Sequence, residues 1–443
     1  MKHNTGIKHS RTAPVACAAA LLAAAAAYAA DDAPAPPAYL VFDTGPAGGS
    51  FAFGSGITNS GWISGAITTA SGALHAGLYL PGDVIDLGTL GGVNSAVEWP
   101  VKNTHGIVVG IAESDTADPN GEVFSCADFI PGTGTTCLPF IWQQTTGMVA
   151  LPLLGGNNGF ATEVNNAGVA VGWAETAVRD PSCIAPQVLQ FLAVEWGPAT
   201  GQKQVLAPWP GDSTSAATAI NDSGQVVGIS GDCGDAVGAF SARHALLWLN
   251  GHPVKLPTLG GQGWNTPMAI NSEGTAAGFS DTPGDVVDGV LTANFQAALW
   301  PASGGIVNLH TLPGDALAEA TGINDRGQIA GTSFAASGAS RAFLWQNGQI
   351  YDLNTLVPAG SALYMLSTGD INDHGDITGQ ACVVASGCTV FHTFVAIPAP
   401  GTGVSGAQSK NESERAALSV ADPRILRQHL HLGQLGAAHI GSD

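Results

Sequence analysis

The chain has 443 residues, of which 60 are glycine and 11% are charged, and its formal net charge is −20. Residues 31–399 hold 30 acidic and 7 basic side chains, a balance of 7 − 30 = −23, and such a field repels nucleic acid and anionic lipid surfaces. After the N-terminus no apolar run reaches the roughly 20 residues that a membrane-spanning helix needs.

The N-terminus has the order of a secretory signal. Lys2, Lys8 and Arg11 precede an apolar segment at 15–27, and Ala27-Tyr28-Ala29 forms a small-x-small cleavage site. The apolar segment is too short for a transmembrane anchor. We therefore expect residues 1–30 to be a signal peptide and the mature chain to be exported, to the periplasm or the medium.

A turn unit, Ile220-Asn221-Asp222-Ser223-Gly224, then recurs along the chain. Close copies stand at 164–168, 270–274, 323–327 and 371–375, and looser copies at 57–61 and 103–106. Asn and Asp side chains can bond their own backbone in a turn, and glycine is free to adopt a positive φ. The unit therefore predicts a hairpin between two short strands, repeated seven times.

Each repeat has a second half with the same character. After the hairpin at 220–228 come the runs 244–248 and 253–256, separated by Asn250-Gly251, and the exit Pro257-Thr258-Leu259-Gly260-Gly261. The glycines that close the hairpins, from Gly65 to Gly379, are about 52 residues apart, close to the ~50 of kelch-type blades. This pattern predicts an all-β, seven-bladed β-propeller of four-stranded antiparallel blades over residues 31–399.

The two ends of the repeat region complement each other. The seventh repeat lacks a fourth strand, whereas residues 39–45 form a surplus strand before the first turn unit. Pairing of that N-terminal strand with the last blade would close the ring and remove two free sheet edges, while a linear solenoid would need capping repeats. Residues 400–443 form a polar C-terminal tail that we expect to be disordered.

Six cysteines remain after the signal peptide, an even number that indicates disulfide bonds in an exported chain. Cys126 and Cys137 flank one loop, and Cys382 and Cys388 flank another, so two local disulfides are predicted. Cys183 and Cys233 follow the second strands of consecutive repeats and could meet across neighbouring loops. The chain has no Cys-x-x-Cys pair, which argues against a zinc site.

Two side-chain series recur at the third strand. Trp142, Trp196, Trp248, Trp300 and Trp345 occupy one position, and we interpret them as core between blades rather than as a sugar-stacking row. His75, His244 and His392 begin that strand, and we interpret them as structural hydrogen-bonding groups, because a catalytic residue is seldom copied around a ring.

The strand His244-Ala245-Leu246-Leu247-Trp248, the Asn-Asp-x-Gly turn and the Leu-Gly-Thr-Leu-Gly-Gly exit resemble those of bacterial exported HAF-repeat proteins. The resemblance covers about residues 38–398, although only His75, His244 and His392 keep the family's histidine. It implies an exported, propeller-like repeat protein and carries no catalytic residues to transfer.

No catalytic motif is visible: Gly-x-Ser-x-Gly, His-Glu-x-x-His and a Walker loop are all absent. An enzyme is therefore the less favoured interpretation, although an axial active site assembled from several blades would leave no local motif. A carbohydrate-active hydrolase or lyase remains the alternative, and it requires two carboxylates about 5–10 Å apart in an axial cleft. A purely structural role would instead leave the axis filled.

In a propeller the connections between strands 2 and 3, and between strand 4 and the next strand 1, share one face. These connections vary in length and hold all six cysteines, so we predict a binding face here for a glycan, an envelope component or a protein. Its candidate residues come from two acidic loops and one tryptophan, expected to be exposed: Asp115, Asp118, Glu122, Trp264, Asp281, Asp285 and Asp288. The acidic loops could also hold Ca²⁺, although they lack the regular ligand spacing of a calcium loop; no other cofactor is expected.

Overall fold

The computed structural model describes residues 36–45, 49, 51–122, 124–198, 201–234, 238–287 and 290–403. The predicted signal peptide at 1–30 lies outside the described residues, as does most of the tail predicted at 400–443. The first tail residues, 400–403, belong to the last strand instead, so the tail begins later than predicted. No helix within the described ranges is long and apolar enough to cross a membrane.

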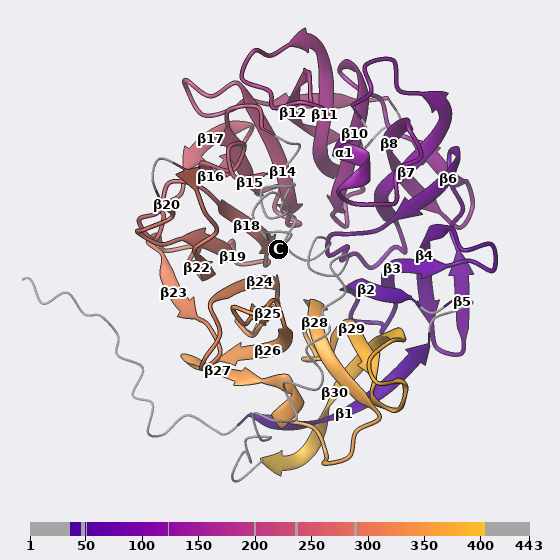
Figure 1. Ribbon diagram of the computed structural model, residues 1–443, viewed down its shortest axis with the longest axis vertical. Helices are drawn as coiled ribbons and strands as arrows, with labels where there is room; N and C mark the ends of the chain where they lie inside the picture. Colours follow the sequence, from indigo (N-terminus) through magenta and orange to yellow (C-terminus); the bar gives the residue numbers. More distant parts are fainter. Residues whose placement is uncertain are drawn as a thin grey trace, which may run out of the picture.

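Seven four-stranded antiparallel sheets are arranged as blades around a central axis, as predicted (Figure 1). Blades 1 to 3 contain β2 (Ala52–Ile57), β3 (Ile63–Thr68), β4 (Leu74–Leu80) and β5 (Asp83–Asp86); β6 (Gly91–Ala96), β7 (Val108–Ala117), β8 (Thr135–Gln143) and β9 (Gly147–Ala150); and β10 (Gly155–Val164), β11 (Ala170–Arg179), β12 (Leu189–Trp196) and β13 (Lys203–Leu206). A short helix, α1 (Phe124–Ala127), lies between β7 and β8.

Blades 4 to 6 repeat this plan. They contain β14 (Thr214–Ile220), β15 (Val226–Gly231), β16 (His244–Leu249) and β17 (His252–Lys255); β18 (Asn265–Ile270), β19 (Ala276–Asp281), β22 (Phe295–Trp300) and β23 (Val307–His310); and β24 (Leu317–Ile323), β25 (Ile329–Phe334), β26 (Ser340–Gln346) and β27 (Gln349–Asp352). Blade 5 also carries a small hairpin of β20 (Val286–Val287) and β21 (Val290–Leu291), and two short 3-10 helices, η1 (Leu353–Thr355) and η2 (Val384–Ser386), lie in loops.

Blade 7 closes the ring. Its strands are β28 (Leu363–Ile371), β29 (Ile377–Val383) and β30 (Phe391–Gly403), and the outermost position is taken by the N-terminal strand β1 (Pro37–Gly45). Leu40 pairs with Ile397 and Phe42 with Val395, and Figure 1 shows the indigo β1 beside the yellow β30. The predicted closure is therefore confirmed.

The third-strand tryptophans lie between blades. The indole Nε1–H of Trp196 donates to Pro152 O at 2.9 Å, and that of Trp300 donates to Pro257 O at 2.7 Å; each acceptor belongs to the exit of the preceding blade. Trp248 makes the same bond to Ala207 O. Trp142, Trp196, Trp248 and Trp300 are buried and Trp345 is partly buried, which confirms that the series is core between blades. The three hydrogen bonds fix the rings of Trp196, Trp248 and Trp300.

The third-strand histidines are hydrogen-bonded structural groups. Nδ1 of His75 lies 2.8 Å from Asp86 Oδ1 on the fourth strand, and Nδ1 of His392 lies 2.8 Å from Asp43 Oδ1 on β1. Arg341, at the same position of blade 6, pairs with Asp352. The position therefore supplies a cross-strand polar pair in several blades.

Candidate functional site

The connections between strands 2 and 3, and between strand 4 and the next strand 1, form one face, which we call the variable-loop face. Three disulfides lie there: Cys126–Cys137, Cys183–Cys233 and Cys382–Cys388. The two predicted local disulfides are confirmed, and Cys183 and Cys233, whose pairing the sequence left open, are bonded to each other. The second joins the loops of blades 3 and 4, whereas the other two lie within single blades.

Buried carboxylates also fix these loops, by accepting hydrogen bonds from them. Glu113 accepts from the backbone N–H of Asn94 at 2.9 Å and from that of Thr133 at 2.6 Å, so one side chain joins strand β6 to the loop after β7. Glu175 does the same in blade 3, accepting from Asn158 N at 2.9 Å and from Gln187 Nε2 at 3.0 Å. Because each carboxylate bonds both the first strand of its blade and the loop between the second and third strands, that loop is fixed relative to the strand.

These carboxylates explain the Gly-Gly pair of the repeat exit. A Cβ added to Gly92, Gly156 or Gly261 would overlap the Cβ of Glu113, Glu175 or Asp281, respectively. The second glycine of the pair is therefore required by close packing against the end of the second strand rather than by the turn alone.

Several of the sequence-predicted site residues belong to this buried network. Glu122 is fully buried and accepts from Val188 N at 2.9 Å. Asp281 accepts from Trp264 N at 2.8 Å, and Asp285 accepts from Gly263 N at 2.8 Å; both carboxylates are buried. These three side chains are therefore directed at loop backbone rather than at a partner in solution.

The remaining candidates have different positions. Trp264 was expected to be exposed, and this is wrong: it is 4% exposed and packs with Phe295 in the core, because the Asp281 carboxylate draws its backbone inward. Asp118 accepts from Asn158 Nδ2 at 2.7 Å, and Asp115 is exposed. Asp288 lies outside the described residues.

Burial shifts the acidity of two of these groups. Desolvation raises the pKa of Asp281 to about 7, and neighbouring Asp285 raises it further, against hydrogen bonds from Trp264 and Asn294 that lower it. Desolvation likewise raises the pKa of Glu175 to about 7, with a lowering hydrogen bond from Gln187 and a raising charge on Glu122. Carboxyl groups that titrate near neutral pH therefore fix two loops.

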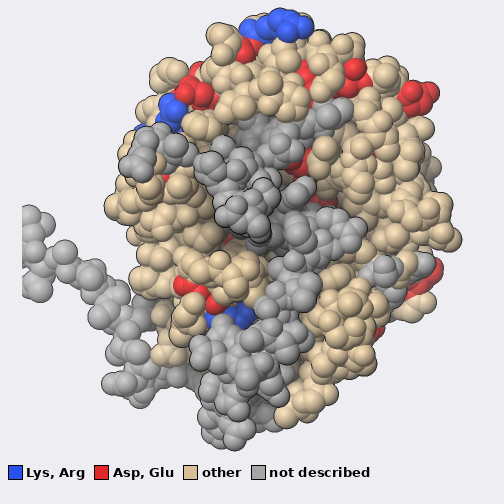
Figure 2. Space-filling model, viewed as in Figure 1, with Lys and Arg blue, Asp and Glu red and all other residues tan. Residues whose placement is uncertain are grey.

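Within the described residues, the acidic loops bring no three Asp, Glu, His or Cys side chains close enough together to share a metal ion. Only one group of described residues brings three potential ligand atoms within 4.8 Å of one another, namely Asp180, Cys183 and Cys233. The two cysteines of this group are bonded to each other in a disulfide, so neither offers a thiolate ligand. On the face in Figure 2, the visible Asp and Glu side chains are scattered rather than gathered into one patch.

The large apolar side chains that the described part of the variable-loop face exposes are aliphatic. Exposed branched side chains occur at or beside these loops: Val93, Val178, Ile184, Val286, Val287 and Val384. No aromatic side chain of this face, as far as it is described, is in the exposed class, since Phe42, the exposed ring, lies on β1. The bonded loops thus expose separate valine and isoleucine side chains on this face of the ring.

The opposite face, made by the hairpin turns between strands 1 and 2, surrounds an axial cavity of about 140 Å³. The turn residues lining it bond from blade to blade. Asn166 N donates to Asp222 Oδ1 at 2.8 Å, and Asp325 N donates to Asp373 Oδ1 at 2.9 Å. We call this set of turn residues the turn ring: Asn59, Thr104, Asn166, Asp222, Ser272, Asp325 and Asp373.

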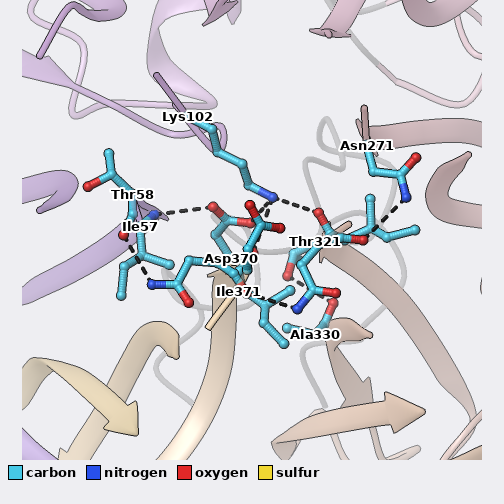
Figure 3. Close-up of polar contacts among 12 residues, drawn as sticks. Ile57, Thr58, Lys102, Asn271, Thr321, Ala330, Asp370 and Ile371 are labelled. Atoms are coloured by element: carbon cyan, nitrogen blue, oxygen red, sulfur yellow. Dashed lines mark hydrogen bonds and ion pairs between the residues drawn. The ribbon is translucent and has the colours of Figure 1, made fainter. Parts of the chain in front are cut away.

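The base of the cavity carries an ionic group. Lys102 of blade 2 reaches across the axis to Asp370 of blade 7, with Nζ 2.8 Å from Oδ1 (Figure 3). Glu163 of blade 3 lines the same cavity and accepts from Ile220 N at 2.9 Å. Desolvation raises the pKa of Asp370 despite the opposing charge of Lys102, and it raises the pKa of Glu163 well above its usual range.

Sequence reasoning missed these three residues, although a signal was present. Lys102 stands where the other six repeats have Ile or Val before the turn. Glu163 and Asp370 stand one position earlier, where the other repeats have glycine, alanine or valine. Departures from an otherwise regular repeat would have identified them.

No protein-family model and no curated protein matches the chain. Among solved structures it resembles a virginiamycin B lyase from Staphylococcus aureus, with 8% identity and a TM-score of 0.46 over 80% of this chain and 99% of that one. It also resembles a puromycin hydrolase complexed with PGG, with 12% identity and a TM-score of 0.39 over 79% of this chain and 52% of that one. At these TM-scores neither likeness bears on activity.

Proposed function

We propose that the chain is an exported binding protein of the HAF-repeat type that presents its variable-loop face to a partner protein. One observation carries the proposal: the loops of that face are fixed by three disulfides and by buried carboxylates, yet they expose aliphatic side chains. Loops that are ordered before binding lose little entropy on binding. The disulfides also favour an oxidising compartment.

The chemistry of the exposed groups favours a protein over the other partners. Sugars commonly stack on exposed aromatic rings, which the described part of this face lacks. An anionic envelope surface would be repelled by a body with a net charge of 7 − 30 = −23. Valine and isoleucine side chains such as Val178 and Ile184 instead suit apolar pockets on a protein.

The alternative, a carbohydrate-active enzyme with an axial site, has less support. The carboxylates that line the axial cavity are already bonded: Glu163 accepts from backbone, and the turn carboxylates accept from the turns of neighbouring blades. Asp370, buried beside the cavity, is paired with Lys102. The cavity volume of about 140 Å³ is below the roughly 300–1,000 Å³ of ordinary ligand pockets. This cavity also opens among the uniform turns rather than among the variable loops.

A photo-crosslinking amino acid placed at Ile184 tests the proposal, with Val149 on outer strand β9 as the matched exposed control. We expect a protein crosslinked at Ile184 and not at Val149. Ile184→Asp should weaken its binding at least tenfold, about 1.4 kcal/mol, whereas Val149→Asp should not. Binding of a glycan or a lipid vesicle without any protein crosslinked at Ile184 would refute the proposal.

A further inference from the structure

The Lys102 ammonium is surrounded by oxygen on the propeller axis. Its Nζ lies 2.7 Å from Ile323 O, 2.8 Å from Asp370 Oδ1 and 3.2 Å from Ile371 O. The two carbonyl oxygens accept hydrogen bonds from the ammonium, and the carboxylate oxygen forms an ion pair with it. Figure 3 shows the side chain extending from blade 2 toward these partners.

The oxygens are positioned by other blades and not by Lys102. Ile323 and Ile371 are equivalent residues of blades 6 and 7, each at the end of its first strand. The fully buried Asp370 is held by Ile57 N of blade 1, which donates to Oδ2 at 3.2 Å. Gly322 leaves the room for this carboxylate, because a Cβ there would overlap Asp370 Oδ1. The oxygen set is therefore built by blades 1, 6 and 7.

We propose that these oxygens form a binding site for a monovalent cation of ammonium size, which the chain fills with its own Lys102. The contact distances of 2.7–3.2 Å exceed the 2.3–2.6 Å of Ca²⁺ and the 2.0–2.1 Å of Mg²⁺. Two neutral carbonyls and one carboxylate match a single positive charge, and backbone carbonyls are the groups that replace water around K⁺ in selective channels.

Two further features affect the charge and the accessibility of this site. Glu163 lines the same cavity and accepts a hydrogen bond from Ile220 N, and burial raises its pKa well above the usual range, which favours the uncharged form of this carboxyl group. Lys102 itself is 26% exposed at its side chain, so the site communicates with the cavity and an ion can enter it when the side chain is removed. This site is independent of the variable-loop face.

The experiment is ion-specific rescue of Lys102→Ile, which installs the residue of five other repeats and removes the ammonium. Melting temperatures are compared in chlorides of potassium, ammonium and tetramethylammonium at equal ionic strength. We expect K⁺ and NH₄⁺ to raise the melting temperature of the variant by a few degrees, saturably, relative to tetramethylammonium. The wild type and the control Lys255→Ile on outer strand β17 should show no such difference.

The double variant Lys102→Ile/Asp370→Asn should lose the response, because its site has no negative charge. If Lys102→Ile does not fold in the tetramethylammonium salt, the folded fraction recovered on refolding in potassium or ammonium chloride replaces the melting temperature as the readout. Equal behaviour of Lys102→Ile in all three salts, or a response that survives Asp370→Asn, would overturn the proposal.

Discussion

The charged residues at the base of the axial cavity are ones that differ from the residues at the same positions of the other repeats. Lys102, Glu163 and Asp370 replace the small or aliphatic residues of the other blades and meet at the axis. Their types were visible in the sequence, but their meeting depends on the convergence of blades 2, 3 and 7 at the axis of the ring (Figure 1). Trp264 is similar, since only its pairing with Asp281 of the next strand explains its burial.

The raised pKa of Asp281 predicts a loss of stability as pH rises. The pKa of this carboxyl group is about 7 in the folded protein, against an ordinary value of 3.8 in the unfolded chain, so the folded state holds more protons between those values. The free energy of unfolding therefore falls from about pH 4 to about pH 7. The side chain of the Asp281→Asn variant cannot ionise. The free energy of unfolding of this variant should therefore rise relative to that of the wild type between pH 4 and pH 7, by up to about 4 kcal/mol.

Thermal or urea unfolding at several pH values measures this difference. Asp83→Asn, at an exposed position of β5, is the matched control and should follow the wild type. A difference between Asp281→Asn and the wild type that stays constant from pH 4 to pH 7 would contradict the prediction.

At the scale of the element, the hairpin turn joins blades as well as strands. Asn221 illustrates both roles: its Oδ1 accepts from Gln225 N within the turn, while its Nδ2 donates to Asn271 O of the next blade at 3.0 Å. The sequence identified the first role, because Asn-Asp-x-Gly is a local turn signal. The second requires the neighbouring blade and was not foreseen.

The blade-to-blade hydrogen bonds of the turn ring are interrupted at Ser272, whose side chain ends in a short hydroxyl group. Asp222 N should donate to residue 272 of the next blade, but no hydrogen bond from it to Ser272 is found among the described residues. At the next junction Ser272 N donates to the longer Asp325 at 2.9 Å. Ser272→Asn should supply the missing acceptor and stabilise the fold by about 0.5–1 kcal/mol.

Chemical denaturation of Ser272→Asn and of Ser272→Leu, a control of similar side-chain length, measures this gain. Asparagine should raise the denaturation midpoint above the wild type, whereas leucine, which offers no acceptor, should not. A midpoint for asparagine at or below that of leucine would count against the turn ring as a stabilising unit.

The three disulfides should contribute unequally. Cys183–Cys233 closes 50 residues and ties two blades, whereas Cys382–Cys388 closes 6 residues within one loop. Chain-entropy arguments assign about 4 kcal/mol to the longer loop and about 2 kcal/mol to the shorter. Paired Cys→Ser variants of each bond, unfolded in urea, should show this order, and the reverse order would refute it.

At the scale of the whole molecule, the fold was readable from the chain alone. Seven copies of one turn, the strand runs between them and the unmatched strand at each end specified the blade number and the closure, because repeats sample the same local rule many times. The variable-loop face was harder to predict, since three of its acidic residues bond backbone: Glu122, Asp281 and Asp285 are buried.

Removal of residues 1–45 should open the ring. Blade 7 would lose β1 and with it Tyr39, which is fully buried, and the edge of β30 would be left unpaired. We expect a lower melting temperature and concentration-dependent association on size exclusion, both reversed by a synthetic peptide of residues 36–45. A scrambled peptide is the control, and an unchanged melting temperature after the deletion would be inconsistent with closure by β1.

The position of β1 also orders events during folding. Asp43 and Thr44 bond His392 and Thr393, 349 positions later, so the segment made first reaches its partner only after almost the whole chain exists. Until then the apolar side chains of β1 lack their β30 neighbours, and such long-range pairing is slow. Ring closure therefore distinguishes complete chains from truncated ones. In a chain that ends before β30, the N-terminal strand β1 has no partner strand and stays exposed to proteases.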